Sequence, residues 1–131
     1  MADWQPHEGA TLLMPSGNQG DHLFVVLNNP KTFPGYGPNP CIVLVNLSTM
    51  YPEAAHDPTC ILQAGCHRFV KKDSYVRYRS ARIESVTQLS AGVRQGLFRP
   101  HDPVSAEILA LMRTGLHASP FTKREFKLLG L

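Results

Sequence analysis

The amino-acid sequence predicts a mainly β protein with one or two helices, folded as a small, partly open β-barrel that a C-terminal helix closes. The chain of 131 residues contains 11 prolines and 10 glycines, which gather in loops between short apolar runs. This arrangement favours short strands joined by turns over a helix bundle. One late segment has apolar residues at helical spacing, and it supplies the closing helix. The length fits one domain that buries a core without disulfides or metals.

The expected single domain, residues 1–131, divides into three parts. Residues 1–13 form a loose lead-in, residues 14–117 form the barrel with its helix, and residues 118–131 form a C-terminal tail. The first residues of the barrel part, MPSGNQGD (14–21), are turn formers throughout. The tail has apolar residues that suit a short helix or a partner-binding segment.

Two apolar runs predict the central strands. HLFVVLNN, residues 22–29, indicates a mostly buried strand that Pro30 closes, and CIVLVNL, residues 41–47, indicates the strongest strand of the chain. Between them, KTFPGYGPNP at residues 31–40 has three prolines and two glycines, so it can form neither a helix nor a regularly paired strand. We expect the two strands to pair as a hairpin, and a loop of this length is often functional.

Three further strands are expected in the middle of the chain. After a loop at residues 48–59, CILQAG (60–65) and CHRFVK (66–71) indicate short strands. In SYVRYRSARIESV, residues 74–86, the type of side chain alternates from one residue to the next over the first half. Because successive side chains of a strand point to opposite faces, this segment has two expected faces. One face carries Tyr75, Arg77 and Arg79, and the other carries Val76, Tyr78 and Ser80.

The late part of the chain predicts one helix. Residues 88–102 (QLSAGVRQGLFRPHD) are expected to be irregular. Asp102 is the expected N-cap of the helix, with Pro103 at its first position. The helix ends at Gly115 or at Ser119–Pro120. Its apolar stripe consists of Ile108, Leu109, Leu111, Met112 and Leu116.

Composition excludes several classes of protein. No apolar run reaches the length that spans a membrane, and the first ten residues lack the basic start and apolar middle of a signal peptide. Three cysteines do not make a disulfide framework, so we expect reduced thiols in a cytoplasmic protein. The sequence also lacks a Walker loop and a dinucleotide fingerprint. A net charge of +3 says little by itself, so its distribution matters more.

The basic residues concentrate in one stretch, AGCHRFVKKDSYVRYRSARI, residues 64–83. It holds six of the 13 Lys and Arg residues against a single acid, Asp73. Two tyrosines are interleaved with the arginines, and bases stack on aromatic rings and guanidinium planes. The stretch is therefore either the solvated face of a strand or a surface that binds a phosphate backbone.

The layout of residues 15–117 resembles the MazF/PemK-like toxin family. Three segments carry the resemblance: PSGNQGDHLFVVLNNP, then PGYGPNPCIVLVN, and finally DSYVRYRSARIESVTQLSAGVRQGLF followed by EILALMRTGL. It implies a small SH3-like barrel and the endoribonuclease (hydrolase) activity of toxin–antitoxin systems. It further implies single-stranded RNA as the substrate, a homodimer, and an antitoxin protein as a partner. The same barrel also occurs in toxins that act on DNA gyrase.

Two active elements of that family differ here. The family has an arginine just before the loop proline, whereas Pro38 and Pro40 follow Gly37 and Asn39. The family also has a Thr or Ser in a turn of the middle strands, and the nearest residues are Thr59 and Ser74. The resemblance therefore implies an altered or lost catalytic set. The alternative function is a non-catalytic barrel module that binds a protein or nucleic-acid partner.

RNA cleavage without a metal needs a base, an acid and a group that stabilises charge on the phosphate. The expected catalytic residues are His22, His67 and Arg77, because histidine titrates near neutral pH and arginine binds phosphate through two hydrogen bonds. Each histidine is alternatively a strand-start residue bonded to the backbone. No cofactor and no metal are expected. The expected nucleic-acid-binding residues are Tyr36, Arg68, Lys71, Lys72, Tyr75 and Arg79.

Two other chemistries remain as alternatives. His56, Cys60, Cys66 and His67 are zinc-ligand types, but their spacing is poor, and adjacent residues on a strand point to opposite faces. Cys66 could also act as a nucleophile if neighbouring basic residues lowered its pKa.

Overall fold

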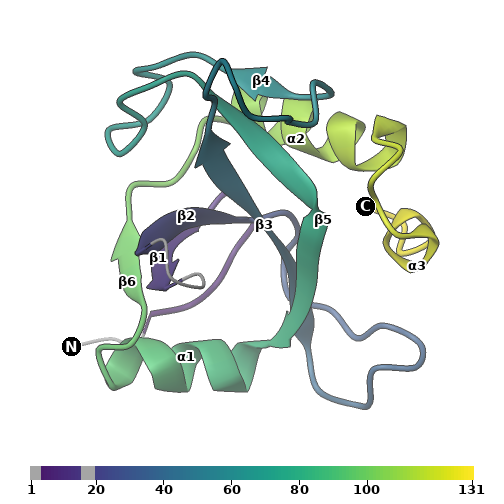
Figure 1. The fold of residues 1–131 in the computed structure, drawn as a ribbon. Coiled ribbons are helices and arrows are strands. Elements are labelled where there is room, and N and C mark those ends of the chain that lie inside the picture. The colour runs from purple at the N-terminus through teal and green to yellow at the C-terminus, as the bar shows by residue number, and fades with distance from the viewer. Residues whose placement is uncertain (1–3, 16–19) are drawn as a thin grey trace.

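A single antiparallel sheet dominates the computed structural model, which describes residues 4–15 and 20–131. The six strands have the order β4-β5-β3-β2-β1-β6, and the sheet curls into a half-barrel (Figure 1). The mainly β prediction is confirmed, with three short helices where one or two were expected. The strands are β1 (Thr11–Pro15), β2 (Asp21–Val26), β3 (Cys41–Thr49), β4 (Ile61–Leu62), β5 (Ser74–Ser85) and β6 (Arg99–His101). The helices are α1 (Val86–Arg94), α2 (Ala106–Ala118) and α3 (Arg124–Lys127).

Each face of the sheet has its own apolar core. One core joins β2, β3 and β5 to Leu109, Met112 and Leu116 of α2 and to Phe126 of α3. The other core lies between the opposite sheet face and α1, which contributes Leu89. Figure 1 shows α1 at the bottom of the view, α2 toward the upper right, and α3 below α2 at the right. Strands β2 and β3 are therefore buried on both faces, as their nearly continuous apolar sequences predict.

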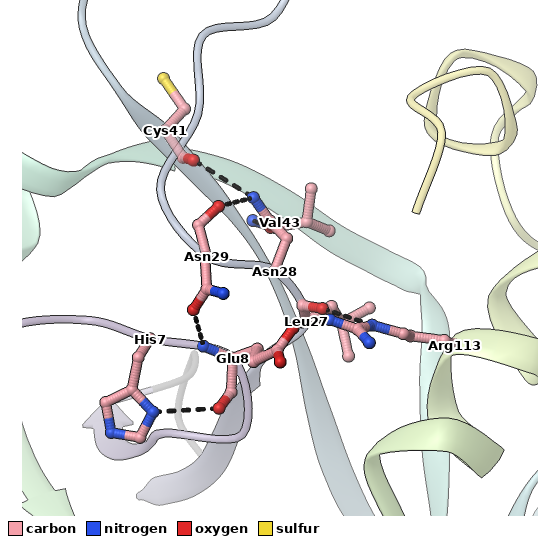
Figure 2. Close-up of polar contacts among 8 residues, drawn as sticks. All are labelled: His7, Glu8, Leu27, Asn28, Asn29, Cys41, Val43 and Arg113. Atoms are coloured by element: carbon pink, nitrogen blue, oxygen red, sulfur yellow. Dashed lines mark hydrogen bonds and ion pairs between the residues drawn. The ribbon is translucent and has the colours of Figure 1, made fainter. Parts of the chain in front are cut away.

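The expected hairpin of β2 and β3 is confirmed, with Val25 opposite Val45. A side chain extends the pairing beyond the last residue of β2. The Asn28 Oδ1 atom accepts a hydrogen bond from the Val43 backbone N–H at 2.8 Å, and its Nδ2 donates to the Cys41 carbonyl at 3.4 Å (Figure 2). Nδ2 also donates to the Asn29 carbonyl, so this buried amide is fully bonded.

Strand β5 bends where its register against β3 changes. Leu44 lies opposite Arg82, and Asn46 lies opposite Arg77, so residues 78–81 of β5 face the single residue Val45. Such extra residues bend a strand and re-aim its side chains. The predicted alternation holds before the bend, because Val76 and Tyr78 are buried whereas Arg77 is half-buried.

Polar contacts tie the start of the chain to its late helix. The Arg113 Nε atom of α2 donates to the Leu27 carbonyl at 2.7 Å, and the Arg113 guanidinium forms an ion pair with Glu8 (Figure 2). The Glu8 backbone N–H donates to the Asn29 side chain at 3.0 Å. Residues near the N-terminus thus pack as an ordered part of the fold.

Three local expectations need correction at the ends of the sheet. Thr11–Pro15 forms β1 between β2 and β6, where a loose lead-in and a turn were expected. The apolar run before Pro15 is strand-forming, and a proline at a strand end costs the ladder little. Residues 16–19 of the expected turn lie outside the described residues. Residues 66–71 are not a strand: the Val70 backbone N–H bonds to the His67 carbonyl and closes a turn.

The late part of the chain also differs from expectation. Residues 86–94, largely expected to be irregular, form α1, whose N-cap Ser85 accepts a hydrogen bond from the Gln88 N–H. Gly92 obscured this helix in the sequence, but a Cβ atom at this position would lie 2.3 Å from the Phe98 ring, so the glycine makes room for that ring. Helix α2 begins later than predicted, because Ser105 and not Asp102 is its N-cap. Of the two predicted ends, Ser119 is confirmed as the C-cap and Gly115 lies inside the helix; the tail contains the short helix α3.

Candidate functional site

One end of the α1-facing sheet surface is polar. Directly paired residues of antiparallel strands place their side chains on the same face. Phe24, Asn46 and Arg77 form one such row across β2, β3 and β5, and Ser48 and Tyr75 belong to the next. His22 lies two residues before Phe24 and so shares this face. The apolar core face thus ends in a group of polar side chains, which we call the polar face: His22, Asn46, Ser48, Tyr75 and Arg77.

A cavity of about 680 Å³ opens beside the polar face. His22, Ser48, Tyr75 and Arg77 all line it. Its other walls come from the loop after β3, including Tyr51 and His56, and from the turn before β5, residues 69–72. This volume is in the range that holds small-molecule ligands or a nucleotide.

The charges around the cavity are mainly positive. Lys71, Lys72 and Arg77 line it, and Asp21 is the one acid among its described lining residues. Asp21 forms an ion pair with Arg99 at 2.5 Å, so its charge is largely offset. A phosphate would therefore meet three cations at the cavity, which favours anion binding.

The surroundings of His22 lower the pKa of its imidazole. Burial lowers its pKa below 6.5, the positive charge of Arg77 lowers it further, and the negative charge of Asp21 only partly opposes them. Its Nδ1 atom is buried and has no hydrogen-bond partner among the described residues. At neutral pH the ring is thus mostly unprotonated, which is the state that a proton acceptor needs.

A second, smaller cavity of about 210 Å³ shares Ala55, His56, Tyr75 and Arg77 with the first. The His56 and Tyr75 rings lie 5.5 Å apart at this junction. The Arg79 guanidinium lies 4.7 Å from the Phe121 ring on the far side. The two cavities therefore adjoin, and cations and aromatic rings line both, an arrangement typical of single-strand nucleic-acid binding.

Asp57 anchors the loop that carries His56. Its buried carboxylate accepts hydrogen bonds from the Thr59 hydroxyl and backbone N–H and from the Ser119 hydroxyl at the end of α2. Burial raises the pKa of Asp57, but the Ser119 and Thr59 hydrogen bonds outweigh it and hold the pKa below 3.8. The wall of the cavity is thus fixed to the helix by an ionised carboxylate.

His67 and Arg68 lie away from the cavity. His67 is buried in a turn, not at the start of a strand, where its Nδ1 accepts from the Phe69 N–H at 3.0 Å and its Nε2 bonds to the Asp102 carbonyl. Arg68 forms an exposed ion pair with Asp102 at 3.3 Å. Both nitrogens of His67 are therefore occupied by the backbone, as the structural alternative for this histidine predicts.

Three other residues named in the sequence analysis either line neither cavity or use their hydroxyl in a local hydrogen bond. Tyr36 is in the loop that the Lys31–Cys41 bridge closes, and it lines neither cavity. The Ser74 hydroxyl donates to the Lys72 carbonyl at 2.9 Å, and the Thr59 hydroxyl donates to Asp57. Of the nine predicted site residues, the first cavity gathers five: His22, Lys71, Lys72, Tyr75 and Arg77.

Two residues of the site have no catalytic or binding role in the sequence prediction. The sequence suggests His56 only as a zinc ligand, and its position in a loop gives no sign of contact with Tyr75. Asn46 sits inside an apolar run, and that setting was the available signal, because a polar residue in a buried strand needs a partner or a function.

The thiol and zinc alternatives find no support in the geometry. Burial raises the pKa of both Cys60 and Cys66, so neither thiol is activated as a nucleophile. Within residues 4–15 and 20–131, no three His, Cys, Asp or Glu side chains are grouped so that they could hold a metal ion.

Comparison of the chain with known protein families, characterised proteins and solved structures finds no match. Among the described residues, no helix has both the length and the apolar character to cross a membrane.

Proposed function

We propose that this protein is a toxin-like endoribonuclease that cuts single-stranded RNA by metal-independent acid/base chemistry. The cavity beside the polar face is the proposed active site. One observation carries the proposal: a histidine, an arginine and two lysines converge on a cavity whose one described acid is paired. Burial and the charge of Arg77 lower the pKa of this histidine, which favours its role as a base. The second cavity, which adjoins the first at Tyr75 and extends to Arg79, suits a chain-like substrate.

The resemblance to MazF/PemK-like toxins is consistent with this function and extends it. On that basis we include three further points in the proposal. The half-barrel is an SH3-like barrel closed at one end by α2. The protein is cytoplasmic and forms a homodimer. A small antitoxin protein binds it and blocks cleavage.

In the proposed reaction His22 is the base. It takes the proton of a ribose 2′-hydroxyl, whose oxygen then attacks the neighbouring phosphorus. A bond forms between the 2′-oxygen and phosphorus, the bond to the 5′-oxygen breaks, and the products are a 2′,3′-cyclic phosphate and a 5′-hydroxyl. Arg77 and the two lysines stabilise the extra negative charge on the phosphate oxygens as the bond forms.

His56 is a better candidate than His67 for the acid that protonates the departing 5′-oxygen. His56 is exposed and lines both cavities, whereas both His67 nitrogens are bonded to the backbone. Neighbouring strands lie about 4.8 Å apart, so the β2 and β5 backbones that flank the polar face are separated by roughly 10 Å. His22 and the His56–Tyr75 pair therefore lie on two sides of the space that a nucleotide would fill.

Incubation of the purified protein with end-labelled single-stranded RNA in EDTA tests the function. We expect fragments that end in a 2′,3′-cyclic phosphate, and a loss of rate of about 100-fold or more in His22→Ala and Arg77→Met. His117→Ala is the matched control, because this α2 histidine lines neither cavity. Absence of cleavage, or equal rates in all variants, would contradict the proposed roles.

A non-catalytic module that binds a nucleic-acid or protein partner is the second candidate. A specific observation favours it: the Thr59 and Ser74 hydroxyls, nearest to the family's second active element, both donate hydrogen bonds within their own turns. RNA binding with a steep salt dependence but without products would support this candidate for RNA.

A further inference from the structure

Two buried asparagines of the central strands differ in their hydrogen bonding. Asn28 is 4% exposed, and its amide bonds to Val43, Cys41 and Asn29 (Figure 2). Asn46 is 1% exposed, yet neither its Nδ2 nor its Oδ1 has a hydrogen-bond partner among the described residues. A buried amide without partners lowers stability, so its presence needs a reason.

The unpartnered atoms concentrate on one surface. In the described part of the chain, five buried side-chain nitrogens and oxygens lack a partner, and four of them belong to His22, Asn46 and Arg82. The register places Arg82 opposite Leu44 on the α1-facing side, and its guanidinium lies 5.3 Å from the Phe24 ring. These atoms thus come from three adjacent strands around Phe24. Of the three residues only His22 lines the first cavity, and Asn46 lies next to the lining residue Arg77 in the sheet.

We propose that Asn46 is a specificity-determining residue whose amide hydrogen-bonds the edge of a nucleobase in this cavity. This inference rests on the proposed RNA-binding function. Arg77 is the side chain opposite Asn46 on β5, and it lines both cavities. Asn46 itself lines neither cavity, so the proposal requires that Arg77 moves onto a bound phosphate and opens access to the amide for the base.

The chemistry of the amide favours a base over a phosphate. An amide offers one donor and one acceptor side by side, and base edges that present an adjacent acceptor and donor match both. A phosphate offers acceptors only and would leave Oδ1 unpaired. A peptide group also has a donor and an acceptor. The cations Lys71, Lys72 and Arg77, however, favour a ligand that carries phosphates. Tyr75 offers a ring on which a base can stack.

Binding of 2′-fluoro RNA hexamers, which lack the attacking hydroxyl, tests the inference. The probes are hexamers of A, C or U and an abasic hexamer of the same length. We expect the unsubstituted protein to bind one of the three base-bearing hexamers about tenfold tighter than the other two. In Asn46→Leu this preference disappears, and stacking on Tyr75 accounts for the remaining difference from the abasic hexamer. Arg77→Met weakens binding of all hexamers alike, because it acts on the phosphates.

Thermal unfolding supplies a readout that does not depend on RNA. Asn46→Leu removes an unpartnered amide, so its Tm should rise by about 4 °C. Asn28→Leu, the matched control, should lower Tm, because it leaves the Val43 N–H and the Cys41 carbonyl unpaired. If Asn46→Leu does not fold, Asn46→Ala tests the same loss of base discrimination.

The outcomes separate this inference from the proposed function. An Asn46→Leu or Asn46→Ala protein that keeps the base preference overturns the inference, even where the unsubstituted protein cuts RNA. Base-dependent binding that is lost in Asn46→Leu, without cleavage of unmodified RNA, supports the inference and overturns the nuclease. A protein that binds no hexamer overturns both.

Discussion

A Cβ atom on Gly115 would lie 2.0 Å from the hydroxyl oxygen of Tyr78. Tyr78 is fully buried, and its hydroxyl donates to the Met112 carbonyl of α2 at 2.8 Å. The bent part of β5 and the helix therefore approach so closely that only glycine fits at position 115. Since Tyr78 directly follows Arg77, this contact also fixes the end of the β5 segment that carries the proposed site.

Gly115→Ala should lower the free energy of unfolding by about 1–3 kcal/mol, because the tyrosine ring must shift in a filled core. The better helix propensity of alanine, about 1 kcal/mol, offsets only part of this overpacking. Urea denaturation measures the change. Thr114→Ala is the control. Residue 114 is exposed on the same helix, so this variant should be slightly more stable than the unsubstituted protein. Equal or higher stability of Gly115→Ala would contradict the close approach.

The pKa of His22 should respond to its two charged neighbours in opposite directions. NMR titration of its ring protons should give a pKa below 6.5, the ordinary histidine value. Arg77→Gln removes a positive charge and should raise this pKa, whereas Asp21→Asn removes a negative charge and should lower it further. A His22 that titrates at 6.5 in all three proteins would show that the burial and the charges do not act on it.

If His22 is the base, cleavage should depend on pH in a matching way. The rate requires the unprotonated ring, so it should rise with pH through the His22 pKa and level off above it. Because that pKa lies below 6.5, activity should persist to lower pH than an ordinary histidine allows. An acidic limb whose midpoint does not follow the His22 pKa in Asp21→Asn would argue for another base.

Asp57→Asn should destabilise the protein by about 1–3 kcal/mol, since an amide cannot accept all three hydrogen bonds from Thr59 and Ser119. The folded-state pKa lies below 3.8, so the carboxylate contributes stability that is present above that pH. This contribution is lost as pH falls through the folded-state pKa. The difference between the two proteins should thus be constant near neutral pH and shrink in acid. Denaturation from pH 7 to pH 3 measures it, with Glu53→Gln in the same loop as the control.

His56→Ala and His67→Ala should have separable effects. His67→Ala leaves the Phe69 N–H and the Asp102 carbonyl without this partner, so stability should fall by about 1–3 kcal/mol. His56 is exposed, so its replacement should change stability by less than about 0.5 kcal/mol. Cleavage should fall by about 100-fold or more in His56→Ala. A folded His67→Ala that loses activity as completely would restore the role that the sequence predicts for His67.

The sequence predicted the central strands well because their signals are local. Apolar runs define β2 and β3, and alternation defines the first half of β5. Strand β1 was missed because turn-forming residues follow its short apolar run. Helix α1 was missed because Gly92 weakens its pattern, and the reason for this glycine, the Phe98 ring, comes from outside the helix.

Part of the candidate site could also be predicted, since Lys71, Lys72, Tyr75 and Arg77 are close in sequence. The rest depends on contacts between distant segments. The position of His56 depends on how Asp57 holds its loop to Ser119, 62 residues away. The role of His67 depends on the Asp102 carbonyl, 35 residues away. No local pattern of residues reports such contacts.

The pairing of β6 with β1 has a consequence for the synthesis of the protein. Thr11 lies opposite His101, and Glu8 pairs with Arg113, so the first strand obtains its outer neighbour from a segment made about 90 residues later. Until then, a chain emerging from the ribosome presents an open strand edge that another chain could join. Non-local pairing of this kind slows folding. We therefore expect folding to finish only after translation has passed α2, and truncation before residue 99 to leave a protein prone to aggregation.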